Sequence, residues 1–223
     1  MEYRHEWKHE VNSLDLRILR RRLLAVAAHD SYGSDGIYEI RSLYFDTPGD
    51  RALREKIDGV NIREKFRLRY YNGDPSFIRL EKKSKVNGLS GKEGVSVTKA
   101  QAECLLAGQP PLRPEDDSPL FREFCVKCRD QGLRPKTIVD YTREAFVFPP
   151  GHVRVTLDFQ IRTGLASTDF FNPDTVTVPA GASPVILEVK WGEFLPDIIL
   201  DAVCLPGRRA CAFSKYAACR LYG

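Results

Sequence analysis

One short segment of the chain carries a row of cations at every second position. The row consists of Arg63, Lys65, Arg67 and Arg69. The positions between them are mostly apolar and include Ile62, Phe66, Leu68 and Tyr70. Because successive side chains of a β-strand point to opposite faces, this spacing predicts a strand with one cationic face and one largely apolar face. Like charges on one sheet face repel each other, so the row indicates either a solvated surface or a site for a multiply charged anion.

The same two-faced pattern recurs elsewhere, with cations and carboxylates mixed. The charged faces carry Arg4, Glu6, Lys8 and Glu10; Arg79, Glu81 and Lys83; Arg154, Thr156, Asp158, Gln160 and Arg162; and Glu188 and Lys190. One arrangement that fits is an open sheet whose charged face meets solvent. The other is a closed barrel whose charged face points inward and whose apolar face is covered by outer helices. Buried charges are costly when unpaired, so a closed barrel would suit a site for a polyanion and a metal ion.

Strands and helices alternate irregularly along the chain. Hydrophobic periodicity and turn residues predict strands at 2–10, 38–46, 61–71, 76–85, 94–98, 134–148, 152–161 and 184–191. Helices are predicted at 12–29, before residue 56, and at 100–107, 119–131 and 213–221. We expect Ser13 to cap the first helix and Asn72-Gly73-Asp74-Pro75 to join the hairpin. We therefore predict one α+β domain over residues 1–223, with mainly antiparallel strands.

The bulk composition is that of an ordinary globular protein. The 223 residues are 43% hydrophobic and carry a net charge of +4, so a basic site must arise from local placement. No apolar run reaches the roughly 18 residues of a membrane-spanning helix, and the charged N-terminus lacks a secretory signal. These features predict a cytoplasmic protein. Cys125 and Cys128 fall at helical spacing among apolar residues, which favours buried residues over a zinc site.

Three other kinds of site are less consistent with the pattern. His5-Glu6-Trp7-Lys8-His9 matches a zinc-protease motif, but in a strand its two histidines would lie about 13 Å apart. The segment 88–92 lacks the first glycine and the hydroxyl residue of a phosphate-binding loop, so a hairpin tip is the simpler interpretation. Tyr70 and Tyr71 could stack on bases. The carboxylates on the same faces would repel a nucleic-acid backbone, so no nucleic-acid partner is expected.

The ordered set of motifs resembles a known family. The segments are Arg4-His5-Glu6-Trp7-Lys8, Ser42-Leu43-Tyr44-Phe45-Asp46-Thr47, Arg67-Leu68-Arg69-Tyr70-Tyr71, Glu81-Lys82-Lys83, Asp140-Tyr141-Thr142-Arg143-Glu144-Ala145-Phe146, Leu187-Glu188-Val189-Lys190 and Ser214-Lys215-Tyr216. Together they resemble the polyphosphate polymerase (VTC) domain in its stand-alone bacterial form, within the CYTH or triphosphate tunnel metalloenzyme superfamily. The resemblance implies an eight-stranded antiparallel β-barrel with outer helices.

The resemblance also implies roles for individual residues. The residues implied as catalytic are Lys8, Arg67, Arg69, Lys83, Arg143 and Lys215. The implied phosphate-binding set adds Lys56, Lys92, Lys190 and Ser214. Glu188 is expected to bind Mn²⁺ or Mg²⁺, with Glu6 and Glu81 as helpers. The last helix begins at Ser214 and Lys215, so its N-terminus would add partial positive charge. Asp158 and Arg162 are expected on the same face, and Arg63 and Lys65 are expected to guide anions to the tunnel mouth.

Three functions are compatible with such a site. The first is a metal-dependent polymerase that transfers the γ-phosphate of ATP to a growing polyphosphate chain. The second is a triphosphatase that acts on inorganic triphosphate or nucleoside triphosphates. The third is a non-catalytic module that binds polyanions. Eukaryotic relatives work beside a membrane channel, so coupling to a membrane would require a separate partner protein.

Overall fold

The computed structural model describes residues 3–33, 35–111, 118–182 and 184–221. The strands are β1 (Tyr3–Val11), β2 (Ala28–His29), β3 (Ile37–Asp46), β4 (Arg63–Tyr71), β5 (Asp74–Val86), β6 (Leu89–Val97), β7 (Arg134–Phe148), β8 (Val153–Thr163), β9 (Val178–Pro179) and β10 (Val185–Trp191). The α-helices are α1 (Ser13–Val26), α2 (Arg51–Ile57), α3 (Lys99–Leu106), α4 (Pro119–Asp130), α5 (Asp197–Val203) and α6 (Lys215–Arg220).

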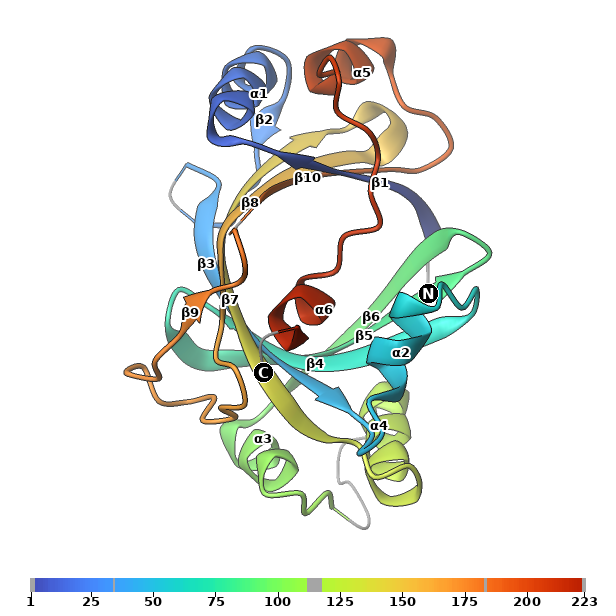
Figure 1. The fold of residues 1–223 in the computed structure, drawn as a ribbon, viewed down its shortest axis with the longest axis vertical. Helices are drawn as coiled ribbons and strands as arrows, with labels where there is room; N and C mark the ends of the chain where they lie inside the picture. The colour runs from blue at the N-terminus through green and yellow to red at the C-terminus, as the bar shows by residue number, and fades with distance from the viewer. Residues whose placement is uncertain (1–2, 34, 112–117, 183, 222–223) are drawn as a thin grey trace.

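The long strands form a closed antiparallel barrel. Neighbouring strands follow the order β7-β3-β4-β5-β6-β1-β10-β8, and a further pairing between β7 and β8 completes the ring. Figure 1 shows the long strands arranged as this ring. The short strands β2 and β9 extend the sheet beside β7 and β8. The closed barrel predicted from the resemblance is therefore confirmed, and the open sheet is excluded.

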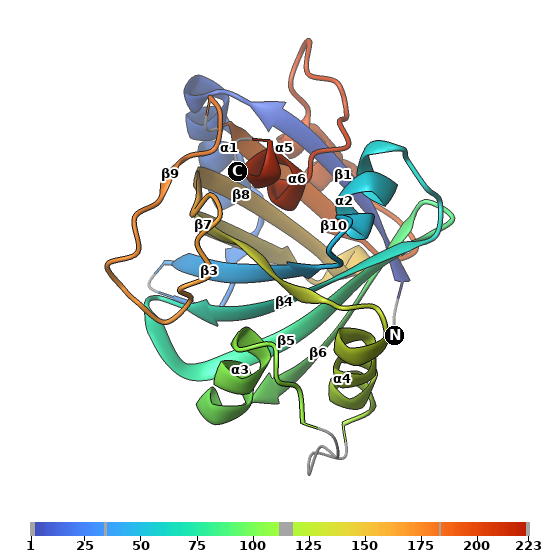
Figure 2. The same ribbon diagram turned by 60° about the horizontal axis from the view of Figure 1, so that its bottom comes forward.

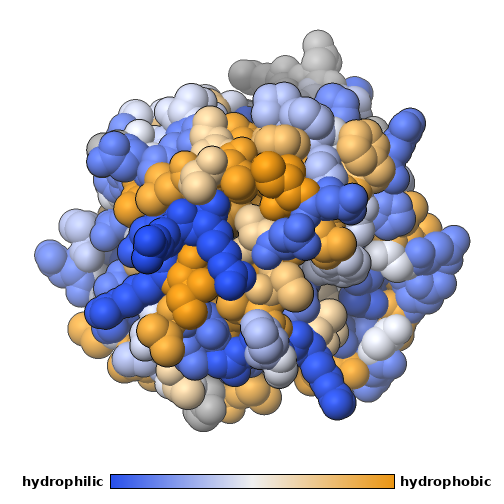
Figure 3. Space-filling view, turned by 90° about the horizontal axis from the view of Figure 1, so that it is seen from above, coloured by the Kyte–Doolittle hydropathy of each residue, from blue (hydrophilic) through white to orange (hydrophobic). Residues whose placement is uncertain are grey.

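Two apolar layers cover the outside of the barrel. In the first layer, Phe121 and Phe124 of α4 and Leu105 of α3 belong to one buried cluster with Phe66 and Leu68 of β4. Figure 2 shows α3 and α4 below β4, β5 and β6. The second layer joins α1 and α5 to the outer faces of β8 and β10. The face that bears α1 and α5 presents a mixture of apolar and hydrophilic residues to solvent (Figure 3).

A third apolar cluster lies inside the barrel and fixes the position of α6. It contains Tyr38, Ile40, Tyr44, Val139, Tyr141, Ala145, Ile161, Ala180, Ile186, Tyr216 and Cys219. The rings of Tyr44 on β3 and Tyr216 on α6 stack with centroids 5.0 Å apart. Figures 1 and 2 together show α6 at one opening of the ring, close to α2. The barrel interior therefore contains an apolar cluster around α6 in addition to its charged side chains.

Several predicted boundaries change in the structure. Asn12, not Ser13, caps α1, because its side chain accepts a hydrogen bond from the backbone N–H of Asp15. The helix also ends at Val26, and residues 28–29 pair with β7. β6 begins at Leu89, five residues earlier than residue 94, because the turn at Asn87 and Gly88 sets it in register with β5. The sequence patterns did not predict α5.

A backbone irregularity in β8 reverses one predicted face. Gln160 has a φ of 53°, and the register between β7 and β8 shifts at this point. Such a bulge moves the following side chains to the other face. Ile161 therefore joins the inner apolar cluster, whereas Arg162 lies outside and donates a hydrogen bond to Thr177. The expectation that Arg162 shares a face with Asp158 was wrong.

The motifs that were set aside have structural roles. His5 lies on β1 and its ring stacks on Trp191 at 5.3 Å. Glu6, the next residue, points to the opposite face and pairs with Lys8 and Lys83. Cys125 is buried in α4 and the cysteines are unpaired. The glycine-rich segment at 88–92 contains the turn between β5 and β6.

Among the residues that the structure describes, no helix has the length and hydrophobicity needed to cross a membrane.

Asp46 at the end of β3 ties two helices to the barrel. Its Oδ1 accepts hydrogen bonds from the backbone N–H of Thr47 (2.8 Å) and Ala52 (2.9 Å). Its Oδ2 accepts from the backbone N–H of Leu53 (3.1 Å) and from the Tyr216 hydroxyl (2.8 Å). One buried carboxylate thus positions both α2 and α6 at the same opening.

The Asp46→Ala variant should be destabilised by about 3 kcal/mol, because several donors would lose their charged acceptor. Chemical denaturation measures this change, provided that the unfolding free energy of each protein depends equally steeply on denaturant concentration. Asp58→Ala, at an exposed position after α2, is the control and should change stability by less than about 0.5 kcal/mol. Equal stabilities of the two variants would contradict the role given to Asp46.

Candidate functional site

Most of the predicted site residues project into the barrel interior. The inward-facing cations on the strands include Lys8, Lys65, Arg67, Arg69, Lys83, Lys92, Arg143 and Lys190, and α6 adds Lys215. The inward-facing carboxylates are Glu6, Glu81, Asp158 and Glu188. Strand register brings opposite charges together. For example, Lys8 of β1 lies opposite Glu188 of β10, and Glu6 lies opposite Lys190.

The first ionic cluster joins Glu6 and Glu188 through shared lysines. Lys8 Nζ lies 3.0 Å from Glu6 Oε1 and 3.4 Å from Glu188 Oε2. Lys83 Nζ donates to Glu6 Oε2 at 2.9 Å. Lys190 contacts Glu188 and lies 3.7 Å from Glu6 Oε2. The two carboxylates therefore face one common region of the interior.

Both carboxylates of this cluster are held in the ionised form. Burial and the repulsion between Glu6 and Glu188 raise the pKa of Glu6, but attraction to Lys83, Lys8 and Lys190 outweighs them and lowers this pKa. Burial likewise raises the pKa of Glu188, and Lys190 and Lys8 bring it well below its usual value. Ionised carboxylates are the hard oxygen ligands that Mg²⁺ and Mn²⁺ prefer.

The donor set fits a divalent cation only in part. Glu6 and Glu188 can each supply oxygen, but within the described residues no group of three or more His, Cys, Asp or Glu side chains comes together. Mg²⁺ commonly takes one or two protein carboxylates and completes its shell with water and phosphate oxygens. A metal at Glu6 and Glu188 would therefore depend on a bound phosphate.

A second cluster surrounds Glu81 and is separate from the first. Arg67 Nε donates to Glu81 Oε2 at 2.8 Å, and Arg69 Nη1 lies 3.6 Å from the same oxygen. Lys92 Nζ donates to Oε1 at 3.1 Å. Burial raises the pKa of Glu81, but Arg69 and Arg67 lower it well below its usual value. The structure places Glu81 as a counterion to two arginines, not beside Glu6 and Glu188.

A third cluster links α6 to the barrel wall. Arg143 binds Asp158 bidentately, with Nε 2.6 Å from Oδ1 and Nη2 2.8 Å from Oδ2. Lys215 also contacts Asp158. Although burial raises the pKa of Asp158, Arg143 and Lys215 bring it to about 2. Asp158 lies on the inner face, where the sequence pattern placed it, and it also holds the first residue of α6 there, which the pattern did not predict.

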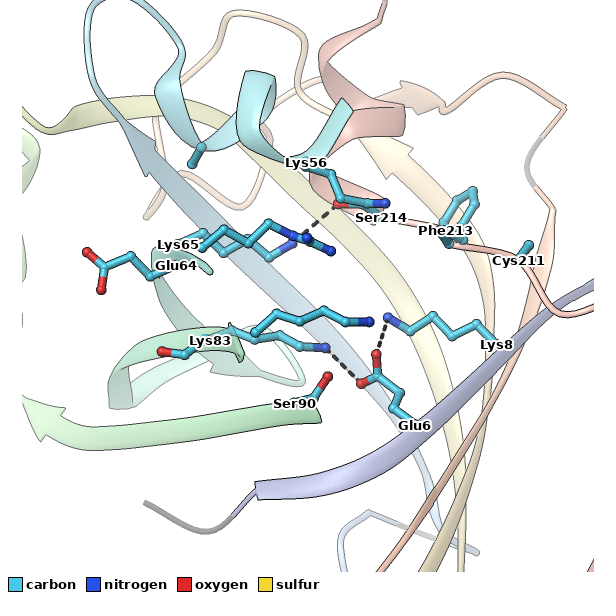
Figure 4. A pocket seen from close by; sticks show the side chains of 15 residues that line it. Glu6, Lys8, Lys56, Glu64, Lys65, Lys83, Ser90, Cys211, Phe213 and Ser214 are labelled. Carbon is cyan, nitrogen blue, oxygen red and sulfur yellow. Dashed lines mark hydrogen bonds and ion pairs between the residues drawn. The ribbon is translucent and has the colours of Figure 1, made fainter. Parts of the chain in front are cut away.

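Six of the fifteen residues that line the cavity at the α6 opening are cations. The cavity has a volume of about 100 Å³, and its lining includes Glu6, Lys8, Lys56, Arg63, Lys65, Lys83, Lys85 and Ser214. Figure 4 shows the ammonium groups of Lys8, Lys65 and Lys83 directed toward the centre of this cavity. Arg67, Arg69, Lys92, Arg143 and Lys190 are not part of this lining. The structure thus brings Lys8, Lys56, Lys83 and Ser214 together at the opening.

Repulsion between the cations changes their protonation. Burial lowers the pKa of Lys65 to about 8; Tyr44 opposes this shift, and Lys8 and Arg67 add to it. Lys65 donates to Ser214 Oγ at 3.2 Å. Burial and Lys8 also place the pKa of Lys83 well below its usual value. An incoming anion would relieve this repulsion, so the cavity is suited to bind one.

Sequence reasoning underestimated Lys65 and overlooked two tyrosines. Lys65 lines the cavity itself, although it was expected only to guide anions toward it. Tyr44 accepts a hydrogen bond from Arg67 Nη1 and Tyr141 accepts one from Arg69 Nη2, both at 2.8 Å. Burial raises the pKa of Tyr44, but Arg67 and Lys65 bring it to about 8. The two-residue period of the strands could have revealed these inward positions.

Anion affinity should fall as the pH rises through about 8, because Lys65 then loses its charge. Since a bound anion raises the pKa of Lys65, binding near pH 8 should take up protons. Calorimetry of tripolyphosphate binding, without metal and in buffers of different ionisation enthalpy, measures this uptake. Lys65→Met should reduce it, whereas Lys99→Met on exposed α3 should not. Unchanged uptake in Lys65→Met would contradict the assignment.

Comparisons with known proteins agree with this architecture. A putative adenylyl cyclase from Hippeastrum, HpAC1, superposes with a TM-score of 0.57 at 14% identity, covering 98% of this chain and 95% of that one. A putative adenylate cyclase from Bacillus halodurans gives 0.52 at 14% identity, covering 89% and 85%. The PH1012 protein from Pyrococcus horikoshii gives 0.51 at 13% identity, covering 95% and 96%. At these identities the likeness establishes the fold alone.

No curated protein matches the sequence. A family model described as the VTC domain, however, matches residues 3–222. That match spans nearly the whole chain and agrees with the closed barrel and its charged interior. The protein therefore belongs to the VTC domain family.

Proposed function

We propose that this protein is a metal-dependent polyphosphate polymerase that transfers the γ-phosphate of ATP to a growing polyphosphate chain. The observation that carries the proposal is a cavity lined by six cations together with two ionised carboxylates. Glu6 lines this cavity, and Glu188 shares Lys8 with Glu6. The cations match the charge of a triphosphate. The carboxylates have no use in a plain anion binder, since they repel phosphate, but they suit a bridging metal ion.

The side chains of the cavity would bind and orient the phosphates. Lys8, Lys65 and Lys83 act as point charges around the triphosphate at the opening. Arg67 and Arg69 can exchange part of their contact with Glu81 for phosphate oxygens, which guanidinium groups bind bidentately. Arg143 and Lys215, held by Asp158, would bind phosphates deeper in the barrel, beyond the lining of the cavity.

Catalysis would follow from this placement of charge. In a loose phosphoryl-transfer transition state, negative charge spreads over the peripheral oxygens. Cations that are already in position stabilise it without reorganisation. A bound Mn²⁺ or Mg²⁺ would add Lewis-acid neutralisation of phosphate oxygens. The acceptor decides the reaction, because a phosphate chain end gives a polymer and water gives hydrolysis.

A triphosphatase is the second candidate. The structure of HpAC1 is described as revealing a dominant triphosphatase activity in that protein. The same cations and carboxylates would serve hydrolysis if water reached the γ-phosphate in the cavity. The shared fold supports this alternative, while the family match supports the polymerase.

Incubation of the protein with ATP and Mn²⁺ should yield a long polyphosphate that is visible on a sizing gel, together with ADP. Release of free phosphate without polymer would instead establish the triphosphatase. If neither product forms at any tested concentration of Mn²⁺ or Mg²⁺, both enzymatic functions are wrong and a polyanion-binding role remains.

Glu188→Gln should reduce metal-dependent turnover at least about 100-fold, the size expected when a group that stabilises the transition state is lost. Metal-free binding of tripolyphosphate should be unchanged or tighter, because the variant removes a negative charge from the barrel interior. Glu193→Gln, at an exposed position after β10, is the matched control and should keep normal turnover. Normal turnover of Glu188→Gln would exclude Glu188 as a metal ligand.

A further inference from the structure

Gly94 on β6 leaves a space in the inner wall that the side chain of Arg79 fills. A Cβ atom at Gly94 would lie only 2.7 Å from Nη2 of Arg79. The φ of Gly94 is outside the left-handed region, so backbone freedom does not explain this glycine. The missing side chain at Gly94 leaves room for the guanidinium of Arg79 to lie against β6.

Arg79 is an inward-facing cation without a counterion. On β5 it lies two residues from Glu81, on the same face, and it is directly opposite Arg69 of β4. Like charges in this relation destabilise a sheet. Arg69 has Glu81 as a partner at 3.6 Å, whereas Arg79 has no ion pair within the described residues. Its Nε is buried and has no hydrogen-bond partner.

The wall beside Arg79 is open to solvent. Lys92, Gly94 and Ser96 share the inner face of β6, and all three are exposed. β1 pairs with β6 only at Ser90 and Gly91, so within the described chain no strand covers the rest of this edge. An extended anion could therefore reach Arg79 without a rearrangement of the barrel.

Arg79 also lies away from the cavity at the α6 opening. Lys83, which lines that cavity, follows Arg79 by four positions on β5 and lies nearer the turn between β5 and β6. Four strand residues correspond to about 13 Å. Glu81, with Arg67, Arg69 and Lys92, occupies the intervening wall. The cations thus form a path from the cavity to Arg79.

We propose that Arg79, seated over Gly94, binds phosphates of a polyphosphate chain beyond those held in the cavity. The proposal rests on the proposed function and assigns a chain-binding residue to the same site. A phosphate at Arg79 would supply the missing acceptor for its N–H groups and relieve the repulsion from Arg69. The planar guanidinium suits the bidentate recognition of phosphate oxygens.

Arg79→Gln should weaken the binding of long-chain polyphosphate about 10-fold, because it removes one charge-assisted contact. Binding of tripolyphosphate, which is much shorter than the long chain and is expected to occupy the cavity alone, should change less than about 2-fold. Both ligands are measured by calorimetry with a chelator present, so that no turnover occurs. Arg162→Gln, on the outer face of β8, is the matched control and should bind both ligands normally.

Gly94→Ala provides a second variant that keeps every charge. The added methyl group displaces the flexible end of Arg79, so long-chain affinity should fall in the same direction but by less than in Arg79→Gln. The melting temperature of ligand-free Arg79→Gln should be unchanged or higher, since repulsion from Arg69 is removed. A purely structural role of Arg79 would instead lower it and would overturn the proposal.

The outcomes separate this proposal from the proposed function. If the natural protein binds neither ligand, the proposed function itself fails. If it binds both, and Arg79→Gln binds the long chain as tightly as the natural protein does, only the role of Arg79 is wrong. An equal loss for tripolyphosphate and the long chain would also overturn the assignment of Arg79 to the distal part of the chain.

Discussion

The repulsion between cations enclosed by the barrel is the constraint on which the rest of this structure depends. Each interior carboxylate contacts more than one cation. Glu81 contacts Arg67, Arg69 and Lys92, and Asp158 contacts Arg143 and Lys215. The cations still outnumber these partners. The excess appears as depressed pKa values at the lysines of the opening, where burial and neighbouring charge act together. The interior therefore has an excess of positive charge, which the proposed polyanionic substrate would neutralise.

The barrel is stable despite this charged interior because its stability comes mainly from apolar contacts on the outer side of the strands. The outer faces of the strands are apolar and are covered by α1, α3, α4 and α5. Burial of that surface supplies the main favourable term in folding. Ring closure then fixes the strand register, and the register sets Lys8 opposite Glu188 and Arg67 opposite Glu81. The same hydrogen-bonded ladder thus supports the fold and distributes the charges of the site.

The α6 opening shows how local anchoring serves the site. Asp46 binds backbone groups of α2 and the hydroxyl of Tyr216, and Asp158 holds Lys215. Ser214, which caps α6, receives a hydrogen bond from Lys65. Residues distant in the sequence are therefore fixed around one cavity. The opening thus combines helix-borne and strand-borne cations. This arrangement would let the proposed triphosphate substrate be bound from several sides.

Period-two alternation by itself determined which strand faces are charged. It placed Arg67, Arg69, Lys83 and Glu188 on such faces because side-chain direction in a strand depends only on local geometry. The ordered motifs also determined the family, which the match over residues 3–222 confirms. The residue that caps α1 was less predictable from the sequence, because Asn12 and Ser13 are both favourable helix caps.

Tertiary structure decided the properties that depend on more than one strand. Alternation cannot distinguish an open sheet from a closed barrel, because closure is a pairing between β7 and β8 that lie at opposite ends of the strand order. It also cannot anticipate the bulge at Gln160, which turned Arg162 outward. The separation of Glu81 from Glu6 and Glu188, and the seating of Arg79 over Gly94, follow from register across neighbouring strands. Side-chain direction is local, whereas the partner of each charge is set by the closed ring.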